Sequence, residues 1–177
     1  MKIWFMAILV MLLTVPAFSH FSGAVNPSAE AAKPFPEINL MTLDGDPVKP
    51  KELKGEVYIV DFWATWCGPC IVEVPNFNAL QAKYGDKGLQ ILGVTMASGE
   101  GKEVKSYVNR YKMKYSVLMI QDEDNSSAAR DLNIMGFPTT FVVTKDWKVY
   151  KRYNGVFAKK AAALEADVQN LLNGKAE

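Results

Sequence analysis

Two cysteines, Cys67 and Cys70, stand two residues apart, and the chain contains no other cysteine. A pair at this spacing can close a small ring by forming a disulfide and open it again by thiol–disulfide exchange. A disulfide across two residues gains little loop-closure entropy, so stabilisation of the fold explains the pair poorly. The spacing therefore indicates a redox pair.

A metal site is the main alternative for two cysteines at this spacing. A structural zinc ion needs four ligands, usually from cysteine and histidine. The chain has no second cysteine pair, and its single histidine, His20, lies near the N-terminus. We therefore expect no metal, and no other motif in the sequence indicates a cofactor.

The segments around the cysteines predict a strand that is followed directly by a helix. Residues 57–63 form an apolar run, interrupted by Asp61, which is typical of a strand covered on both faces. Residues 68–84 repeat apolar side chains at helical spacing, and Pro75 is expected to kink this helix. Cys67 then lies at the helix N-terminus, where free N–H groups and the macrodipole favour a thiolate.

The rest of the chain alternates strand and helix patterns, which predicts a three-layer α/β sandwich. An imperfect alternation over residues 37–43, followed by the turn signal Asp44-Gly45, predicts an N-terminal β-hairpin. The other expected elements are strands at 89–96, 115–120, 139–144 and 148–153, and helices at 103–113, 127–132 and 158–172.

The first residues resemble an export signal. Lys2 precedes an apolar stretch from 3 to 15, and small residues follow, so residues 1–19 are predicted to be a signal peptide or an N-terminal membrane anchor. Residues 20–34 are rich in Ala, Ser, Pro and Gly and are predicted to be a flexible tether. The folded domain is then expected over 35–174, in a periplasmic or other extracytoplasmic compartment.

Composition excludes some partners. Hydrophobic residues make up 49% of the 177 residues and charged residues 22%, which are ordinary values for a globular protein. The formal net charge of +1 provides no electrostatic basis for binding nucleic acid. We expect a monomer that does not bind nucleic acid.

The chain from about residue 35 to 172 resembles the thioredoxin superfamily, and within it the exported TlpA/ResA-type thiol-disulfide oxidoreductases. The resemblance rests on VDFWATWCGPC at 60–70, on Glu73 with Pro75, and on GFPTTF at 136–141. The N-terminal segment from LDG at 43–45 to ELKG at 52–55 also resembles the hairpin of this family. The resemblance implies the α/β thioredoxin fold: a central mixed β-sheet flanked by helices, with an N-terminal β-hairpin extension.

Two acids are candidate proton carriers. A carboxylate inside an apolar strand is either buried for a reason or sits at an exposed strand end, and both interpretations of Asp61 are open. The resemblance implies that Asp61 is buried beneath Cys70 and accepts its proton. It also implies that Glu73 lines the site, although a first-turn acid that complements the helix dipole is an equally good interpretation. Which acid handles the proton is open.

The resemblance also implies a groove for a partner polypeptide. Pro138 is expected to follow a cis peptide bond beside the cysteines, whereas a loop proline that merely precedes a strand would be trans. Backbone groups of Phe137 and Thr139 would then hydrogen-bond an extended peptide. The predicted partner-binding residues are Trp66, Gly68, Pro69, Phe137, Pro138 and Thr139.

These residues predict a protein-disulfide oxidoreductase in which Cys67 attacks and Cys70 resolves. The Gly68-Pro69 dipeptide resembles that of thioredoxin, a strong reductant. We therefore expect reduction of exported partner proteins, for example in cytochrome c maturation, with electrons from a membrane-embedded donor.

Three alternative functions are open. An exported oxidase or isomerase would share these motifs. A thiol peroxidase is disfavoured because Ala64 stands where its Thr-x-x-Cys motif needs threonine. A binding module with a permanent disulfide is the non-enzymatic alternative.

Overall fold

A seven-stranded mixed sheet forms the centre of the protein. The computed structural model describes residues 33–120 and 125–175. The strand order is β2-β1-β5-β4-β3-β6-β7, with β3, β4 and β5 parallel and the pairs β1–β2, β1–β5, β3–β6 and β6–β7 antiparallel. The strands are β1 (Leu40–Met41), β2 (Pro47–Val48), β3 (Val57–Trp63), β4 (Leu89–Thr95), β5 (Ser116–Ile120), β6 (Thr139–Thr144) and β7 (Val149–Asn154).

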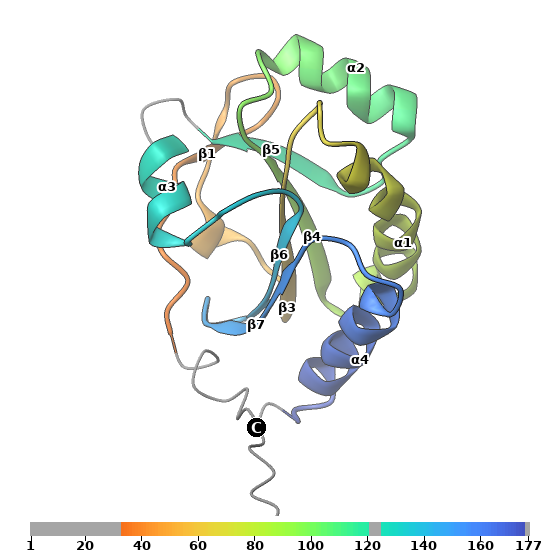
Figure 1. Ribbon diagram of the computed structural model, residues 1–177. Coiled ribbons are helices and arrows are strands. Elements are labelled where there is room, and N and C mark those ends of the chain that lie inside the picture. Colours follow the sequence, from red (N-terminus) through yellow and green to blue (C-terminus); the bar gives the residue numbers. More distant parts are fainter. Residues whose placement is uncertain (1–32, 121–124, 176–177) are drawn as a thin grey trace, which may run out of the picture.

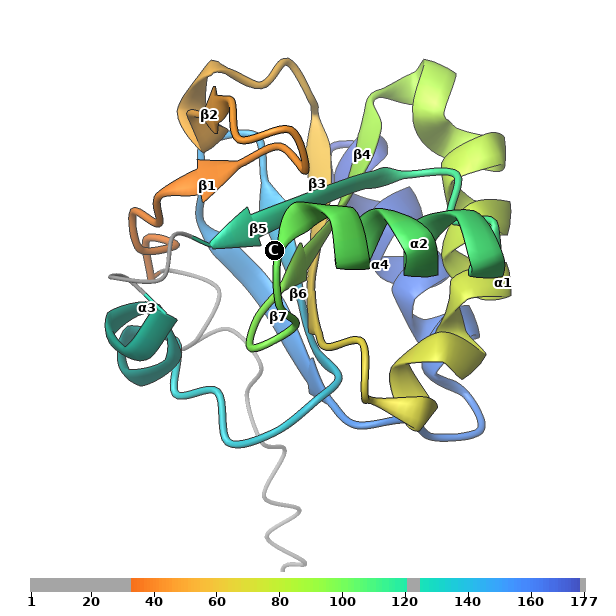
Figure 2. The same ribbon diagram turned by 90° about the horizontal axis from the view of Figure 1, so that it is seen from above.

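Helices cover both faces of this sheet, as the α/β prediction required. Helices α1 (Gly68–Tyr84), α2 (Gly101–Tyr111) and α4 (Lys160–Leu172) lie on one side, and α3 (Asn125–Asp131) lies on the other (Figures 1 and 2). The strands β3, β4 and β5 follow one another across the sheet, so crossovers of the same hand place α1 and α2 on the same face.

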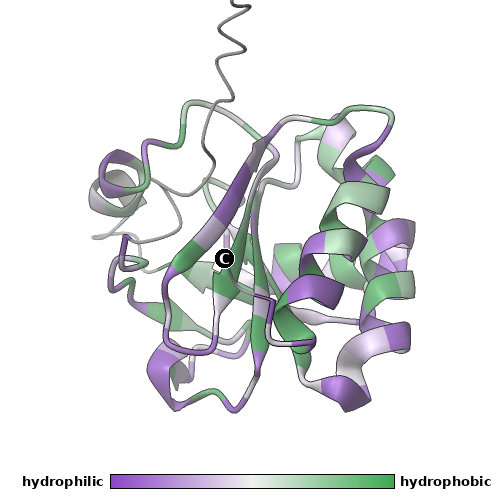
Figure 3. Ribbon diagram, turned by 90° about the horizontal axis from the view of Figure 1, so that it is seen from below, coloured by the Kyte–Doolittle hydropathy of each residue, from purple (hydrophilic) through white to green (hydrophobic). Residues whose placement is uncertain are grey.

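Strand β3 lies inside the sheet, between β4 and β6, and every one of its residues is buried. Its side chains alternate between the two faces because successive side chains of a strand point in opposite directions. Val57 and Ile59 pack with residues of α1 and α4, whereas Val60 and Phe62 pack into the cluster that includes α3. Figure 3 shows the hydrophobic colouring concentrated on the central strands and on the helix surfaces that face them.

Most predicted elements are present, with shifted ends. The hairpin consists of two-residue strands only, and α2 begins at Gly101, two residues before the predicted start. Helix α1 ends at Tyr84, as predicted, with Gly85 as its C-cap residue at φ −55°, and the chain continues through a short 3-10 turn. The left-handed residue is Gly88, at φ 104°, where a Cβ atom would meet the Glu56 side chain.

The proposed signal or anchor at 1–19 and most of the tether at 20–34 lie outside the described residues. Lys33 and Pro34, assigned to the tether, are described and lie against the last hairpin. The Lys33 carbonyl accepts from the amide of Val149, and Pro34 forms a bridge with Lys148. In residues 33–120 and 125–175, no helix has the length and apolar character needed to span a membrane.

Candidate redox active site

The cysteines lie at the N-terminus of α1, as predicted, and are joined by a disulfide. Cys67 is the N-cap residue of α1, and its Sγ accepts a hydrogen bond from the amide of Cys70 at 3.2 Å. The exposed fractions of Cys67 and Cys70 are 5% and 3%, so both are largely covered, Cys70 slightly more. When the bond is reduced, the free N–H groups of this helix end favour a thiolate at Cys67.

The loop before Cys67 is held by the segment that follows β4, a support that sequence reasoning missed. The amide of Thr65 donates to Ser98 Oγ at 3.0 Å, and the indole N–H of Trp66 donates to the Ala97 carbonyl at 2.9 Å. Ser98 Oγ in turn donates to the Met96 carbonyl. These bonds fix the loop although the Trp66 side chain is 66% exposed.

A second loop approaches the cysteines from the other side of the site. The Phe137–Pro138 bond is cis, which confirms the expectation from the family resemblance. The ring of Phe137 lies 5.6 Å from the ring of Trp66, between centroids. The Pro138 carbonyl accepts from the amide of Gly155 at 2.8 Å. This loop lines an open pocket of about 540 Å³.

The predicted partner-binding residues differ in how far they are exposed to solvent. Gly68 and Pro69 are exposed beside the disulfide. Thr139, in contrast, is buried as the first residue of β6, flanked in the sheet by Phe62 and Asn154. Phe137 precedes the strand. This placement favours Phe137 over Thr139 as the residue that offers backbone groups to a peptide, and the roles themselves remain predictions.

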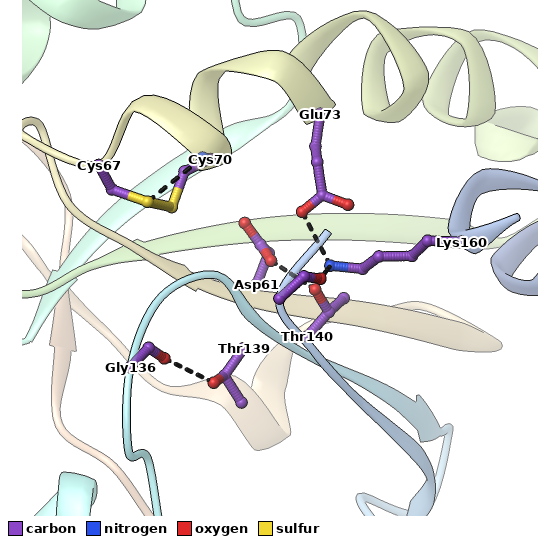
Figure 4. A network of polar contacts seen from close by, with 9 residues as sticks. Asp61, Cys67, Cys70, Glu73, Gly136, Thr139, Thr140 and Lys160 are labelled. Atoms are coloured by element: carbon purple, nitrogen blue, oxygen red, sulfur yellow. Dashed lines mark hydrogen bonds and ion pairs between the residues drawn. A yellow bond between two sulfur atoms is a disulfide. The ribbon is translucent and has the colours of Figure 1, made fainter. Parts of the chain in front are cut away.

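Asp61 is buried, and the exposed-strand-end interpretation is wrong. The side chain is 3% exposed in the middle of the sheet, and its Oδ1 accepts from Thr140 Oγ1 at 2.6 Å (Figure 4). Burial raises the pKa of the Asp61 carboxyl to about 7, against the hydrogen bond from Thr140 and the charge of Lys160, which both lower it. The negative charge of Glu73 adds to the rise. Asp61 can therefore exchange a proton near neutral pH.

Glu73 is also buried, and it does not act as an exposed acid at the helix end. Its Oε2 lies 2.8 Å from the Nζ of Lys160, and the side chains of Glu73 and Lys160 are 5% and 2% exposed. Burial raises the pKa of Glu73, while the hydrogen bond and charge of Lys160 oppose that rise. Figure 4 shows Glu73 and Asp61 entering the same buried region from α1 and β3.

Sequence reasoning missed Lys160 and Thr140. For Lys160 a signal was present: Leu164 and Val168 follow at intervals of four residues, which places all three on one face of the helix. For Thr140 no local signal exists, because its contact depends on the register that pairs it with Asp61 across β3 and β6. The sequence analysis placed Thr140 within the GFPTTF stretch and Lys160 within the helix predicted at 158–172, and it gave neither residue a role in the site.

Chemically, this arrangement combines a reversible disulfide with a buried carboxyl that can carry a proton. A dithiol needs such a group when its second thiol must lose a proton to attack. Among the described residues, no cluster of three or more His, Cys, Asp or Glu side chains could hold a metal ion.

Comparison with known proteins shows the family to which the chain belongs. The sequence profile of the Redoxin family matches residues 30–172. The chain belongs to the Redoxin family. This Redoxin-family protein is TlpA/ResA-like within the thioredoxin superfamily, as the sequence resemblance implied.

Its similarity to individual relatives extends over most of their length. The thiol:disulfide interchange protein DsbE of Pseudomonas fluorescens biotype C is 32% identical over 162 residues, which cover 88% of this chain and 87% of that protein. The thiol-disulfide oxidoreductase ResA of Bacillus thuringiensis (strain Al Hakam) is 30% identical over 155 residues, covering 86% and 87%. A crystal structure of a thioredoxin-family thiol:disulfide interchange protein from Chlorobium tepidum TLS superimposes with a TM-score of 0.64 at 28% identity, covering 82% of this chain and 97% of that one. The predicted thioredoxin fold is thereby confirmed.

Proposed function

We propose that this protein, a thiol-disulfide oxidoreductase of the ResA/DsbE type, reduces disulfides of exported partner proteins through Cys67 and Cys70. The observation that carries the proposal is the Cys67–Cys70 disulfide at the N-terminus of α1, with the buried Asp61 carboxyl on the adjoining strand. The names of the relatives, which describe disulfide exchange, support it.

The reaction begins with the reduced protein. The Cys67 thiolate attacks one sulfur of a partner disulfide, and the other partner sulfur leaves as a thiolate. The Cys70 thiol then gives its proton to the Asp61 carboxylate, and the resulting thiolate attacks Cys67 Sγ. The partner leaves with its second thiolate, so it has gained two electrons and the protein has become the disulfide. Asp61, with a pKa of about 7, can release the proton near neutral pH.

The exposed surface around the cysteines is the proposed docking region. Trp66, Gly68 and Pro69 are exposed on one side of the disulfide, and Phe137 with Pro138 forms the other side. An extended segment of the partner would lie between them and pair with the backbone at Phe137.

The cellular setting follows from the same proposal. A reductant in an oxidising compartment has to be recharged, so we infer a membrane-embedded electron donor, an extracytoplasmic location and export by residues 1–19, as a cleaved signal or as an anchor. Apocytochrome c, whose cysteines would be reduced from a disulfide to thiols in cytochrome c maturation, is the proposed example of a partner. The protein is proposed to act as a monomer without a metal or cofactor.

The reduction potential tests the direction of the reaction. Equilibration of the purified protein with dithiothreitol or glutathione buffers is expected to give a value near that of thioredoxin, about −270 mV. A value near that of a strong oxidant, about −120 mV, would contradict the reductant role and favour an oxidase.

Trapping tests whether exchange occurs at all. A Cys70→Ser variant expressed in the source cell cannot resolve the mixed disulfide and is expected to accumulate Cys67 adducts, which can be identified by mass spectrometry. The double variant Cys67→Ser/Cys70→Ser is the matched control and should trap nothing. Absence of adducts with Cys70→Ser would contradict the exchange function.

A further inference from the structure

Lys160 connects three parts of the active site. Its Nζ donates to Glu73 Oε2 of α1 at 2.8 Å and to the Gly155 carbonyl at 3.0 Å. The amide of the same Gly155 donates to the carbonyl of Pro138, in the cis-proline loop. A continuous set of contacts therefore runs from the helix that carries Cys70, through Lys160 of α4, to the loop proposed to bind the partner. Figure 4 shows the first of these contacts, between Glu73 and Lys160.

The two buried acids do not have equivalent contacts with this lysine. Glu73 forms a direct ion pair with it, whereas the hydrogen bond of the Asp61 carboxyl comes from the neutral hydroxyl of Thr140. A buried carboxylate is costly unless it is paired, so a single ammonium beside two carboxyls stabilises the charge of the one that it contacts. The other carboxyl is the one whose charge can change.

We propose that Lys160 is a positioning residue of the redox site, which holds Glu73 as its fixed counter-ion and thereby leaves Asp61 as the carboxyl that takes up and releases the proton of Cys70. This inference rests on the proposed exchange function and answers which of the two acids carries the proton. Lys160 touches no reacting sulfur in this arrangement, and it acts through Glu73, Gly155 and the electrostatic field at Asp61.

The ionisable groups that face this region come from several elements. Asp61 lies on β3, Glu73 and Cys70 on α1, and Lys160 on α4, while Tyr115 precedes β5. Burial raises the pKa of the Tyr115 phenol far above its ordinary value, and the charges of Asp61 and Glu73 add to this. Tyr115 therefore stays neutral in the range in which Asp61 titrates. The pKa of Asp61 itself, about 7, is lowered by Lys160 and raised by Glu73.

The test follows the carboxyl groups directly. The ¹³C chemical shifts of the Asp61 and Glu73 carboxyls are measured against pH in the oxidised protein, together with the pH dependence of the rate at which a mixed disulfide on Cys67 is resolved in the reduced protein. In the wild type, Asp61 is expected to titrate at about pH 7, and Glu73, whose charge is paired with Lys160, is expected not to titrate together with it.

Four variants test the role of Lys160 by the shift that each causes. Lys160→Met removes the cation and should move the Asp61 midpoint and the rate profile upward by about one pH unit. Glu73→Gln frees the ammonium to act on Asp61 and should move both downward. The double variant Glu73→Gln/Lys160→Met should lie between the two single variants, and Lys160→Arg, which keeps the charge, should restore a midpoint near that of the wild type.

Lys151→Met is the matched control. Lys151 also pairs with a buried acid of α4, Asp167, but outside the redox site, and its removal should leave the Asp61 midpoint unchanged. If Lys160→Met does not fold, the double variant, which leaves no unpaired charge at Glu73, is compared with Glu73→Gln, from which it differs only at Lys160, and its Asp61 midpoint should be the higher of the two. An Asp61 midpoint that does not rise when Lys160 is removed, either from the wild type or from Glu73→Gln, would overturn the proposal, as would a Glu73 that titrates together with Asp61 in the wild type.

Failure of this inference can be told apart from failure of the proposed function. If the wild type never releases a partner from Cys67, exchange itself is wrong, whatever the carboxyl titrations give. If exchange proceeds and the titrations do not respond to Lys160, only the role of Lys160 is wrong.

Discussion

Among the described residues, two lysines pair with buried carboxylates, and the two sites differ in how many acids lie near the lysine. Asp167, in the second half of α4, accepts a hydrogen bond from the Tyr153 hydroxyl. Its Oδ1 lies 3.3 Å from the Nζ of Lys151, and the Lys151 side chain is 40% exposed. At the start of α4, Lys160 is 2% exposed and has two carboxyls nearby, of which it contacts only Glu73. We call these the outer pair (Lys151, Asp167) and the inner cluster (Asp61, Glu73, Lys160).

The number of acids near the lysine distinguishes a structural ion pair from a site that can transfer a proton. In the outer pair one acid has one partially solvated cation and one hydroxyl donor, so its charge is satisfied. In the inner cluster the number of acids exceeds the number of cations, away from water, and one carboxyl is left with a pKa of about 7. A group with such a pKa, on the strand that leads to the cysteines, is suited to proton transfer. The following predictions test whether this difference is real.

The largest expected effect is on stability when each lysine is removed. Lys160→Met leaves Glu73 buried without its partner and should lower the free energy of unfolding by about 3–5 kcal/mol. Lys151→Met removes a half-exposed cation and should cost less than about 1 kcal/mol. Urea denaturation of the oxidised variants measures both. Equal losses would contradict the distinction between the inner cluster and the outer pair.

Asp61 should make stability depend on pH in an unusual direction. Its folded pKa of about 7 lies above the ordinary value of 3.8, so between these pH values the folded state binds more protons than the unfolded state. Stability therefore falls as the pH rises from about 4 to about 7, and the loss is complete above the folded pKa. At about 1.4 kcal/mol per pKa unit, the total is on the order of 4 kcal/mol.

The matched variant for this pH dependence is Asp61→Asn, which stays neutral. The difference in unfolding free energy between Asp61→Asn and the wild type should grow in favour of the variant from pH 4 to pH 7 and remain constant above it. Denaturant titrations at five or more pH values, with the disulfide kept intact, measure this. A difference that does not change with pH would mean that Asp61 is already ionised in the folded protein.

The next effect is kinetic. A positioned base commonly contributes 10²–10⁴-fold to a proton transfer, so Asp61→Asn should slow resolution of a mixed disulfide on the order of 100-fold at pH 7. Asp167→Asn, the corresponding change in the outer pair, should leave the rate unchanged. Stopped-flow release of a fluorescent peptide from Cys67 gives the rate. A similar loss in both variants would mean that these acids act through the fold alone.

The smallest expected effect concerns the neutral donors of the two acids. Thr140→Val removes the hydrogen bond that stabilises the Asp61 anion, so the pH midpoint of the exchange rate should rise, by no more than about one unit. Tyr153→Phe removes the hydroxyl that donates to Asp167 and should not move the midpoint. The comparison of the two pH–rate profiles makes this test, and a downward shift with Thr140→Val would contradict the assigned hydrogen bond.

The local parts of the site could be read from the sequence. The strand β3, the long helix α1 and the position of the cysteines at their junction were all predicted with their observed bounds, because apolar periodicity and the placement of proline are local signals. The strand β6 was also predicted with its observed bounds, and the cis bond before Pro138 followed from resemblance.

The starts of other helices were predicted less well. Helix α2 begins at Gly101 and α4 at Lys160, against predicted starts at 103 and 158. The ends of a helix depend on how the chain enters and leaves the neighbouring elements as well as on local preference, so they shift by a residue or two.

The sequence by itself therefore determined the redox pair, its place at a helix N-terminus, and the buried strand that carries Asp61. Which acid pairs with Lys160, and which accepts from Thr140, depends on the tertiary structure. Lys160 reaches Glu73 across 87 positions of the chain, and Thr140 reaches Asp61 across 79, through the packing of α4 on α1 and the register of β6 on β3. Such contacts depend on how elements pack, which the local preferences of a sequence do not specify. For that reason, Asp61 and Glu73, which were both candidate proton carriers in the sequence, are proposed to have different roles in the folded protein.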